Sequence, residues 1–350
     1  MANYTEAPED DYDVFITDDP KDNEARQCDK YEAQVLSAQL VPHLYSLVSL
    51  VGLLGNILLV FILVKRKGLK QVENIYFLNL AVSNLCFLLT LPFWAYAASH
   101  GGSIGEPICT ILAGLCAIGL YGEALFSTLL IVQRYLVFLE VRRSCWTTKT
   151  VPCSIITSVL AWVIVILITL PECIFYKPQM DDQVYKCTIS RAPFLPRDET
   201  SWKFILTLKM NVVVVVFPLV ILLFLYVQMR KTLRVRERSR DLFKLVFAIA
   251  VVFLLMWAPY NVALFLSAFK EDFSLHDCES SYSLDRSVQI TRIIATTHCC
   301  VNPLLCVFLD KEFRKNLRHL FRLRISTALQ PNEASAQGPL RDDSGQSTQL

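Results

Sequence analysis

The chain has 350 residues, of which 53% are hydrophobic and 19% are charged, and its 34 Lys and Arg nearly balance its 32 Asp and Glu. An average soluble domain carries roughly 25% charged residues, and the mean hydropathy of +0.40 argues against disorder. The formal net charge of +2 argues against a general nucleic-acid binder, which would be strongly basic. An integral membrane protein is therefore the first class to test.

The N-terminal segment, residues 1–39, is acidic and has no apolar period, so we expect an extended, mobile arm. It lacks the basic and then apolar pattern of a cleavable signal peptide. Asn3 begins an N-glycosylation sequon, which has value only if the arm is extracellular. Tyr12 lies among acids in a setting suited to sulfation, with an unmodified tyrosine as an equal alternative.

Seven mainly apolar runs follow, and each is long enough to cross a bilayer, which takes about 20 residues as a helix. A buried soluble core could explain one or two such runs, but not seven in series. The sequence thus predicts an all-α membrane protein in which residues 40–309 form a seven-transmembrane helix bundle. The runs are Leu40–Val64, Ile75–Ala97, Ile108–Leu139, Val151–Phe175, Phe204–Met229, Leu242–Phe269 and Val288–Leu309.

Positive charges gather after the first, third, fifth and seventh runs, for example at Lys65–Lys67 and Arg142–Arg143. Because short loops rich in Lys and Arg stay in the cytoplasm, these sides are expected to be cytoplasmic and the N-terminus extracellular. We therefore expect a multi-pass protein of the plasma membrane. A transporter is the structural alternative, but the sequence has no evident inverted repeat or pair of broken helices.

Residues 310–324, directly after the seventh run, predict a short amphipathic helix that lies on the cytoplasmic leaflet. Phe313, Leu317, Leu320 and Phe321 fall on one face of this helix, and basic residues occupy the other. The remaining residues, 325–350, are polar, and we expect a disordered cytoplasmic tail.

Four of the twelve cysteines lie outside the membrane or at its outer rim, namely Cys28, Cys109, Cys187 and Cys278. Four cysteines allow three pairings. A metal site is the alternative, but the spacings lack the close ligand pair typical of zinc sites. An enzyme is also disfavoured, because no serine–histidine–acid or metal-ligand spacing stands out among the five histidines. We expect no cofactor.

Each span also carries a short motif. The motifs are Gly55-Asn56, Leu78–Ala81, Thr90–Trp94, Arg134–Leu136, Trp162, Pro218, Trp257–Asn261 and His298–Pro303. Together they resemble the rhodopsin-like G-protein-coupled receptors over about residues 40–323. The Thr-x-Pro-Phe-Trp, Trp-Ala-Pro-Tyr-Asn and His-Cys-Cys motifs resemble those of the chemokine receptor family, and the chain resembles an atypical member of that family.

The resemblance implies two extracellular disulfides, Cys109–Cys187 and Cys28–Cys278. It implies a protein ligand, chemerin, with chemokines as the second candidate, and an acidic arm would attract a basic ligand surface. Further implied partners are membrane lipid, arrestin and neighbouring signalling receptors. The implied role is to bind a chemoattractant protein and to concentrate or present it with little or no G-protein signalling. A conventional signalling chemoattractant receptor is the alternative.

The ligand pocket implied by the resemblance includes Trp94, Tyr260 and Arg292. Most chemokine receptors have a glutamate at the position of Arg292, where it attracts the positive N-terminus of the ligand. Arg292 inverts that charge and should repel such an amine. The alternative is an arginine whose head extends to the outer membrane interface.

The cytoplasmic switch implied by the resemblance departs from signalling receptors at two positions. Gln133 stands where those receptors have an aspartate beside the arginine, and Cys306 stands where they have a tyrosine. We expect Gln133 to remove a charged contact of the arginine, although it could also raise basal activity or be a tolerated polar change. A thiol is too short and too weak a donor to replace a phenol. The expected switch residues are Gln133, Arg134, Tyr135, Asn302, Pro303 and Cys306.

The sodium site of the family is expected to be degenerate, and we predict no metal ion here. Asn84 replaces the aspartate of the second span, and Glu123 adds a carboxyl group to the third. Such a group at bilayer depth is costly and is a candidate for a functional role. Either the acid has moved from one span to the other, or Glu123 is protonated and forms a hydrogen bond with Asn84. Burial without a positive neighbour favours the second interpretation.

Overall fold

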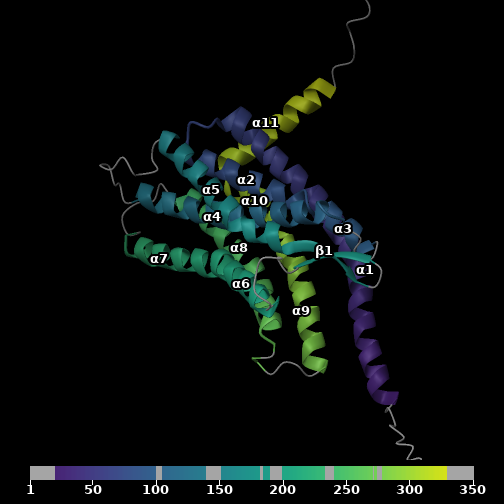
Figure 1. The fold of residues 1–350 in the computed structure, drawn as a ribbon. Helices are drawn as coiled ribbons and strands as arrows, with labels where there is room; N and C mark the ends of the chain where they lie inside the picture. Colours follow the sequence, from purple (N-terminus) through teal and green to yellow (C-terminus); the bar gives the residue numbers. More distant parts are fainter. Residues whose placement is uncertain are drawn as a thin grey trace, which may run out of the picture.

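Seven segments of the computed structural model are long and apolar enough to cross a membrane, which confirms the predicted seven-transmembrane bundle. The structure describes residues 20–99, 105–138, 151–181, 184–189, 199–232, 240–270, 272–273 and 278–328. The membrane segments are Gln39–Lys67, Val72–Ser99, Ile108–Leu136, Val151–Phe175, Phe204–Gln228, Lys244–Ala268 and Ser283–Leu309. Their helices pack side by side in one bundle (Figure 1).

The first four spans run from α1 to α5. The first is α1 (Pro20–Ile62), which ends in the π-helical turn η1 (Leu63–Lys67); the second is α2 (Val72–Leu88) with α3 (Leu91–Ser99); the third is α4 (Ile108–Phe138); the fourth is α5 (Val151–Phe175). The second span is divided just before Pro92, which has no backbone donor. At this break, the hydroxyl of Thr90 donates a hydrogen bond to the carbonyl of Phe87 at 2.7 Å.

The remaining spans run from α6 to α10, and α11 follows them. The fifth is α6 (Glu199–Asn211), η2 (Val212–Val216) and α7 (Phe217–Thr232); the sixth is α8 (Arg240–Ala268); the seventh is α9 (Cys278–Thr296) with α10 (His298–Leu309). The π-helical segment η2 ends two residues before Pro218, whose missing N–H leaves a carbonyl of the preceding turn without its usual donor.

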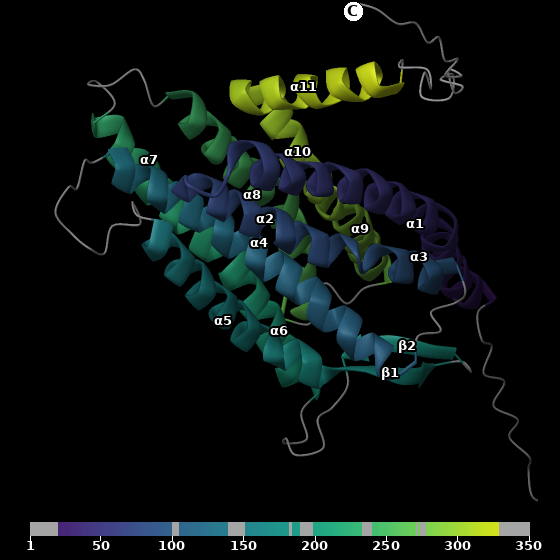
Figure 2. The ribbon, with the colours of Figure 1, turned by 90° about the horizontal axis from the view of Figure 1, so that it is seen from above.

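Both ends of the helical body extend beyond the boundaries expected from the sequence. α1 begins at Pro20, so residues 20–39 are helical rather than extended, and a proline suits the first turn of a helix. α11 (Lys311–Ala328) turns away from α10 and crosses the end of the bundle (Figure 2). The expected glycosylation and sulfation positions, Asn3 and Tyr12, lie outside the described residues, as does the tail from residue 329.

α4 lies at the centre of the bundle, where it contacts α2, α5, α7 and α8. Two glycines let it approach α2 closely. A Cβ atom added at Gly119 would lie 2.7 Å from the backbone nitrogen of Phe87, and one at Gly122 would lie 2.5 Å from the hydroxyl of Ser83. Side chains larger than hydrogen would therefore push the two helices apart.

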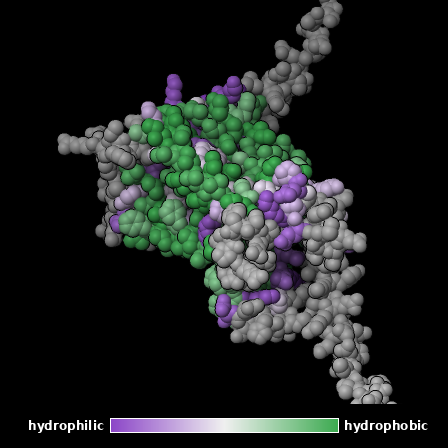
Figure 3. Space-filling view, viewed as in Figure 1, coloured by the Kyte–Doolittle hydropathy of each residue, from purple (hydrophilic) through white to green (hydrophobic). Residues whose placement is uncertain are grey.

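A β-hairpin of β1 (Tyr176–Asp181) and β2 (Val184–Ile189) lies at the end of the bundle away from α11 (Figure 2). The strands are antiparallel, and Pro178 pairs with Cys187. The flank of the bundle is apolar on the face seen in Figure 3. Many of the exposed apolar side chains of the bundle come from α5, including Ile156, Val159 and Leu167. This is the surface that a helix bundle presents to lipid.

Candidate functional site

The disulfide Cys109–Cys187 joins β2 to the first turn of α4, with the two Cα atoms 5.5 Å apart. This pairing, which the resemblance implied, is confirmed. The hairpin is thus fixed to the end of the bundle at which α4 begins. The other expected pair, Cys28–Cys278, stays a prediction, because the side chains of both cysteines lie outside the described residues.

At the end of the bundle that carries the β-hairpin, the three residues expected to line a ligand pocket come together from α3, α8 and α9. The guanidinium of Arg292 lies over the ring of Trp94, with 5.9 Å between its carbon and the ring centroid. Tyr260 is near enough to act on that charge, together with Tyr45 of α1 and Tyr176 of β1. The side chain of Arg292 is exposed, so the charge is open to solvent at the mouth of the bundle.

A second polar group lies between the third, fourth and fifth spans, and the sequence analysis missed it. The hydroxyl of Tyr121 donates to Glu172 at 2.5 Å, and the ammonium of Lys209 donates to the other carboxylate oxygen at 2.6 Å. Lys209 also donates to the carbonyl of Ile168 at 2.9 Å. The signal in the sequence was the ionisable residue inside each of the fourth and fifth apolar runs.

An aromatic chain leads inward from the pocket. The ring of Tyr260 lies 5.8 Å from that of Trp257, and Trp257 lies 5.2 Å from the imidazole of His298. Phe87 and Phe253 also contact His298, with centroid distances of 5.4 and 5.9 Å. These edge-to-face contacts connect the group of Trp94, Tyr260 and Arg292 to the buried polar centre.

The buried polar centre differs from the expected Asn84–Glu123 contact. Glu123 contacts the Nε2 atom of His298 and accepts a hydrogen bond from Asn302 at 2.7 Å. Asn84 instead donates to Asn56 at 3.3 Å. The expected hydrogen bond between Asn84 and Glu123 is therefore wrong, because a histidine and an amide of α10 supply nearer partners for the carboxyl group.

The two ring nitrogens of His298 face different partners in this buried polar centre. Its Nδ1 atom lies 2.6 Å from the carbonyl of Ala295, which can only accept, so Nδ1 carries a proton. Its Nε2 atom then faces Glu123 and the thiol of Cys299, 3.1 Å away. The three possible ligand atoms lie within 4.8 Å of one another, so the cluster could hold a metal ion. Hydrogen bonds between Glu123, His298 and Cys299 would account for the same contacts without a metal ion. The expectation of no metal therefore stays a prediction.

At the end of the bundle near α11, Arg134 keeps an acidic partner that the sequence analysis did not identify. Its guanidinium lies 2.9 Å from a carboxylate oxygen of Glu73 in the first turn of α2. The amide of Gln133 reaches the same oxygen at 3.5 Å. The expectation that Gln133 removes the charged contact of the arginine is therefore wrong, because the acid comes from the neighbouring helix.

The other expected switch residues lie close by. Cys306 is buried, with 3% of its surface exposed, and within the described residues its thiol makes no hydrogen bond. Pro303 packs against Gly55 of α1. Tyr135 is half-buried against the core. The thiol of Cys306 is therefore small, buried in the bundle and unpaired within the described residues.

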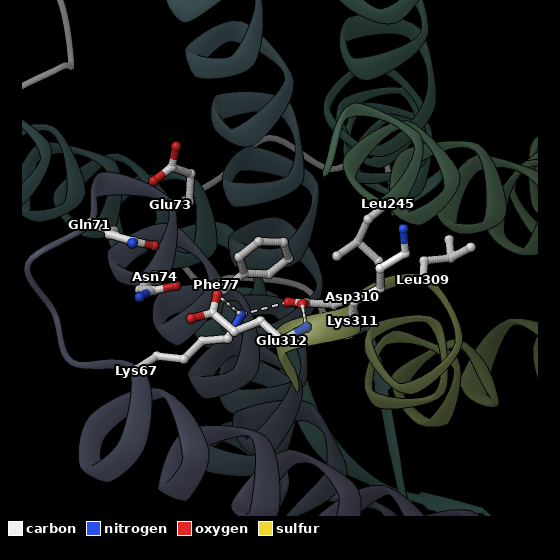
Figure 4. Close-up of a pocket in the computed structure, with 10 residues that line it drawn as sticks. All are labelled: Lys67, Gln71, Glu73, Asn74, Phe77, Leu245, Leu309, Asp310, Lys311 and Glu312. Carbon is white, nitrogen blue, oxygen red and sulfur yellow. Dashed lines mark hydrogen bonds and ion pairs between the residues drawn. The ribbon is translucent and has the colours of Figure 1, made fainter. Parts of the chain in front are cut away.

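A cavity of about 240 Å³ opens beside this switch, between α2, α8 and the start of α11 (Figure 4). Lys67 reaches across it to Asp310 at 2.6 Å and to Glu312 at 3.6 Å. Asp310 also caps α11, because its other oxygen accepts the backbone N–H of Phe313 at 3.0 Å. Glu73 lines the same cavity, and its carboxylate points away from the Lys67 cluster in Figure 4.

Comparison with known proteins places these features in one family. The model of the rhodopsin family of seven-transmembrane receptors matches residues 55–305. The chain is 64% identical to C-C chemokine receptor-like 2 of Homo sapiens over 350 residues, all of both chains. It is 64% identical to chemokine C-C motif receptor-like 2 of Bos taurus over 338 residues, 97% of each chain.

A relative from the wider group is C-C chemokine receptor type 1 of Homo sapiens, which is 39% identical over 322 residues, 91% of this chain and 89% of that protein. The chain therefore belongs to the rhodopsin family of G-protein-coupled receptors. Within that family it is a chemokine receptor-like protein of the plasma membrane, and it is a receptor rather than an enzyme.

Proposed function

We propose that this receptor binds a chemoattractant protein at the cell surface and concentrates or presents it with little or no G-protein signalling. The resemblance names chemerin as the ligand, with chemokines as the second candidate. The N-terminus is extracellular in this proposal, so the acidic segment before Pro20 meets the ligand first. Opposite charges on the two surfaces would speed their encounter.

The proposal for silence is supported above all by the buried thiol of Cys306. Signalling relatives have a tyrosine at this position, and a phenol can form a hydrogen bond across the opened cytoplasmic end. The thiol of Cys306 is 3% exposed and is too short to make that bond. An active arrangement would then lack a stabilising contact, and ligand binding would shift few molecules into it.

A conventional signalling receptor is the second candidate, and the contact of Arg134 with Glu73 favours it. The pair at 2.9 Å means that the arginine is still held by a carboxylate in this arrangement, although its neighbour is Gln133. A receptor that keeps this restraint could also keep a regulated release of it.

The decisive experiment measures ligand binding and G-protein activation on the same cells. Labelled chemerin should bind saturably to cells that express the chain, while calcium and cyclic AMP stay at their basal levels. A matched signalling receptor in the same cells controls for the presence of G protein. A strong calcium response that Arg134→Ala abolishes would establish the signalling alternative. Arrestin recruitment, measured in parallel, would separate ligand uptake from G-protein coupling.

A further inference from the structure

Arg292 differs from Lys209 and Arg134, two other cations of the bundle, because it has no carboxylate partner among the described residues. Lys209 contacts Glu172 at 2.6 Å, and Arg134 contacts Glu73 at 2.9 Å. Within the described residues, no Asp or Glu lies within ion-pair distance of Arg292. A charge at the mouth of a membrane bundle that is left without a counter-charge is available to a ligand.

Among the residues that the structure describes, the carboxylates nearest to Arg292 in the fold or along its helix are either occupied or distant. Glu172 is held by Tyr121 and Lys209, so its charge is already neutralised. Asp285 lies on the same helix as Arg292, but seven residues earlier, which corresponds to about 10 Å along the helix axis. The electrostatic environment of Arg292 consists instead of phenol and thiol groups.

The side chains around Arg292 favour an acceptor as its partner. The ring of Trp94 faces the guanidinium and leaves the N–H groups at the edge of the guanidinium plane free. The indole N–H of Trp94 is buried and has no acceptor in the described residues. Burial raises the pKa of Tyr176, and Tyr260 adds to the effect, so the hydroxyl of Tyr176 stays protonated.

We propose that this cluster of Arg292, Trp94, Tyr45, Tyr176 and Tyr260 is a carboxylate-binding site at the mouth of the bundle. A guanidinium binds a carboxylate through two parallel hydrogen bonds, whereas an ammonium group of a ligand is repelled. The carboxylate is either the C-terminus of a protein ligand or one of its Asp or Glu side chains. The inference rests on the proposed function only in taking the ligand to be a protein.

Three small probes of one shape test the site independently of any protein ligand. They are 3-phenylpropionate, its primary amide and 3-phenylpropylamine, and ligand-observed NMR measures their binding to the full chain in nanodiscs. The carboxylate should bind about tenfold or more tightly than the amide, since hydrogen bonds to charged groups are the strong ones. Arg292→Glu should reverse the preference toward the amine.

Matched variants separate the site from general charge effects. Arg292→Lys should retain part of the carboxylate preference, which also shows that a changed side chain here still folds. Arg286→Glu, an exposed residue on the same helix, should leave the preference unchanged. Equal binding of all three probes to the unmodified chain overturns the proposal. So does an Arg292→Glu variant that still prefers the carboxylate.

A protein probe distinguishes the two sources of the carboxylate. Chemerin with a free C-terminus and chemerin with an amidated C-terminus are compared on the unmodified chain and on Arg292→Gln. If the C-terminus is the source, amidation weakens binding to the unmodified chain alone. If a side chain is the source, Arg292→Gln weakens both forms equally. If chemerin binds equally well with and without Arg292, the protein ligand does not occupy this site. If chemerin does not bind at all, the proposed ligand is rejected, and the result with the small probes still stands.

Discussion

The carboxylate of Glu73 lies 2.9 Å from the guanidinium of Arg134, so the acid that signalling relatives carry beside this arginine is supplied here by a different helix. The pair is well enclosed, with 7% of the Arg134 side chain and 20% of the Glu73 side chain exposed. Because an unpaired buried charge is costly, the loss of either partner should destabilise the protein.

Glu73→Gln should therefore destabilise the purified receptor by about 1–3 kcal/mol, the usual cost of leaving a buried polar group unsatisfied. It should also raise any basal G-protein activation, since Arg134 is released. Thermal unfolding in detergent and a basal activation assay measure the two effects. Glu312→Gln, an exposed acid on α11, is the control. Adding Gln133→Asp to Glu73→Gln should restore stability; if it does not, the charge of Glu73 is not what holds Arg134.

Replacing both altered switch residues should restore coupling only in part. The change is Gln133→Asp combined with Cys306→Tyr, measured as ligand-stimulated calcium release. Glu123 and Arg292 remain different from those of signalling relatives, so the ligand would still prefer the active state only weakly, and differential affinity limits the population shift. Full recovery of the signal would show that these two positions alone cause silence.

The disulfide Cys109–Cys187 should be needed for surface expression and ligand binding. Removing a native disulfide costs about 2–5 kcal/mol in small secreted domains, and here the loss should fall on the hairpin over the pocket. Cys109→Ser is compared with Cys86→Ser, which changes a free thiol inside α2.

Non-reducing peptide mapping should also recover Cys28 joined to Cys278, and a peptide that joins Cys28 to another cysteine would contradict the second bridge.

Neutralising the acids at Asp10–Asp13 should slow ligand association. Exposed charges are screened over about 8 Å at physiological ionic strength, so the difference between variant and parent should shrink as salt is added. Surface plasmon resonance at low and high salt measures both rates. An association rate that is unchanged at low salt would remove the arm from the binding mechanism, whereas a changed dissociation rate alone would point to a direct contact.

Gly119→Ala should destabilise the receptor by about 1–3 kcal/mol, the usual cost of overpacking a core. The new Cβ atom would lie 2.7 Å from the backbone nitrogen of Phe87, which cannot move away without shifting α2. Gly105→Ala is the matched control, because nothing lies within 4 Å of a Cβ atom there. Equal thermal stability of the two variants would mean that α2 and α4 are not in close contact.

The sequence predicted the seven spans and the bridge from Cys109 to Cys187, because apolar run length and family motifs are local signals. It did not predict that Glu73 meets Arg134, since the two residues lie on different spans and their contact depends on how each helix is rotated. The same limit explains the error at Asn84. The sequence singled out Glu123 as a buried acid, but its partners, His298 and Asn302, lie on α10, and the sequence alone does not give the position of α10 beside Glu123.

The close approach of α4 to α2 at Gly119 and Gly122 has a consequence for how Arg134 can be released. Arg134 and Glu73 belong to these two tightly packed helices, so we expect the two residues to move together. An outward swing of α8 would widen the cytoplasmic end without pulling the pair apart. Release of Arg134 then requires either an incoming partner that competes for its charge or protonation of Glu73. The ion pair therefore covers the charge of Arg134 and does not lock together helices that separate.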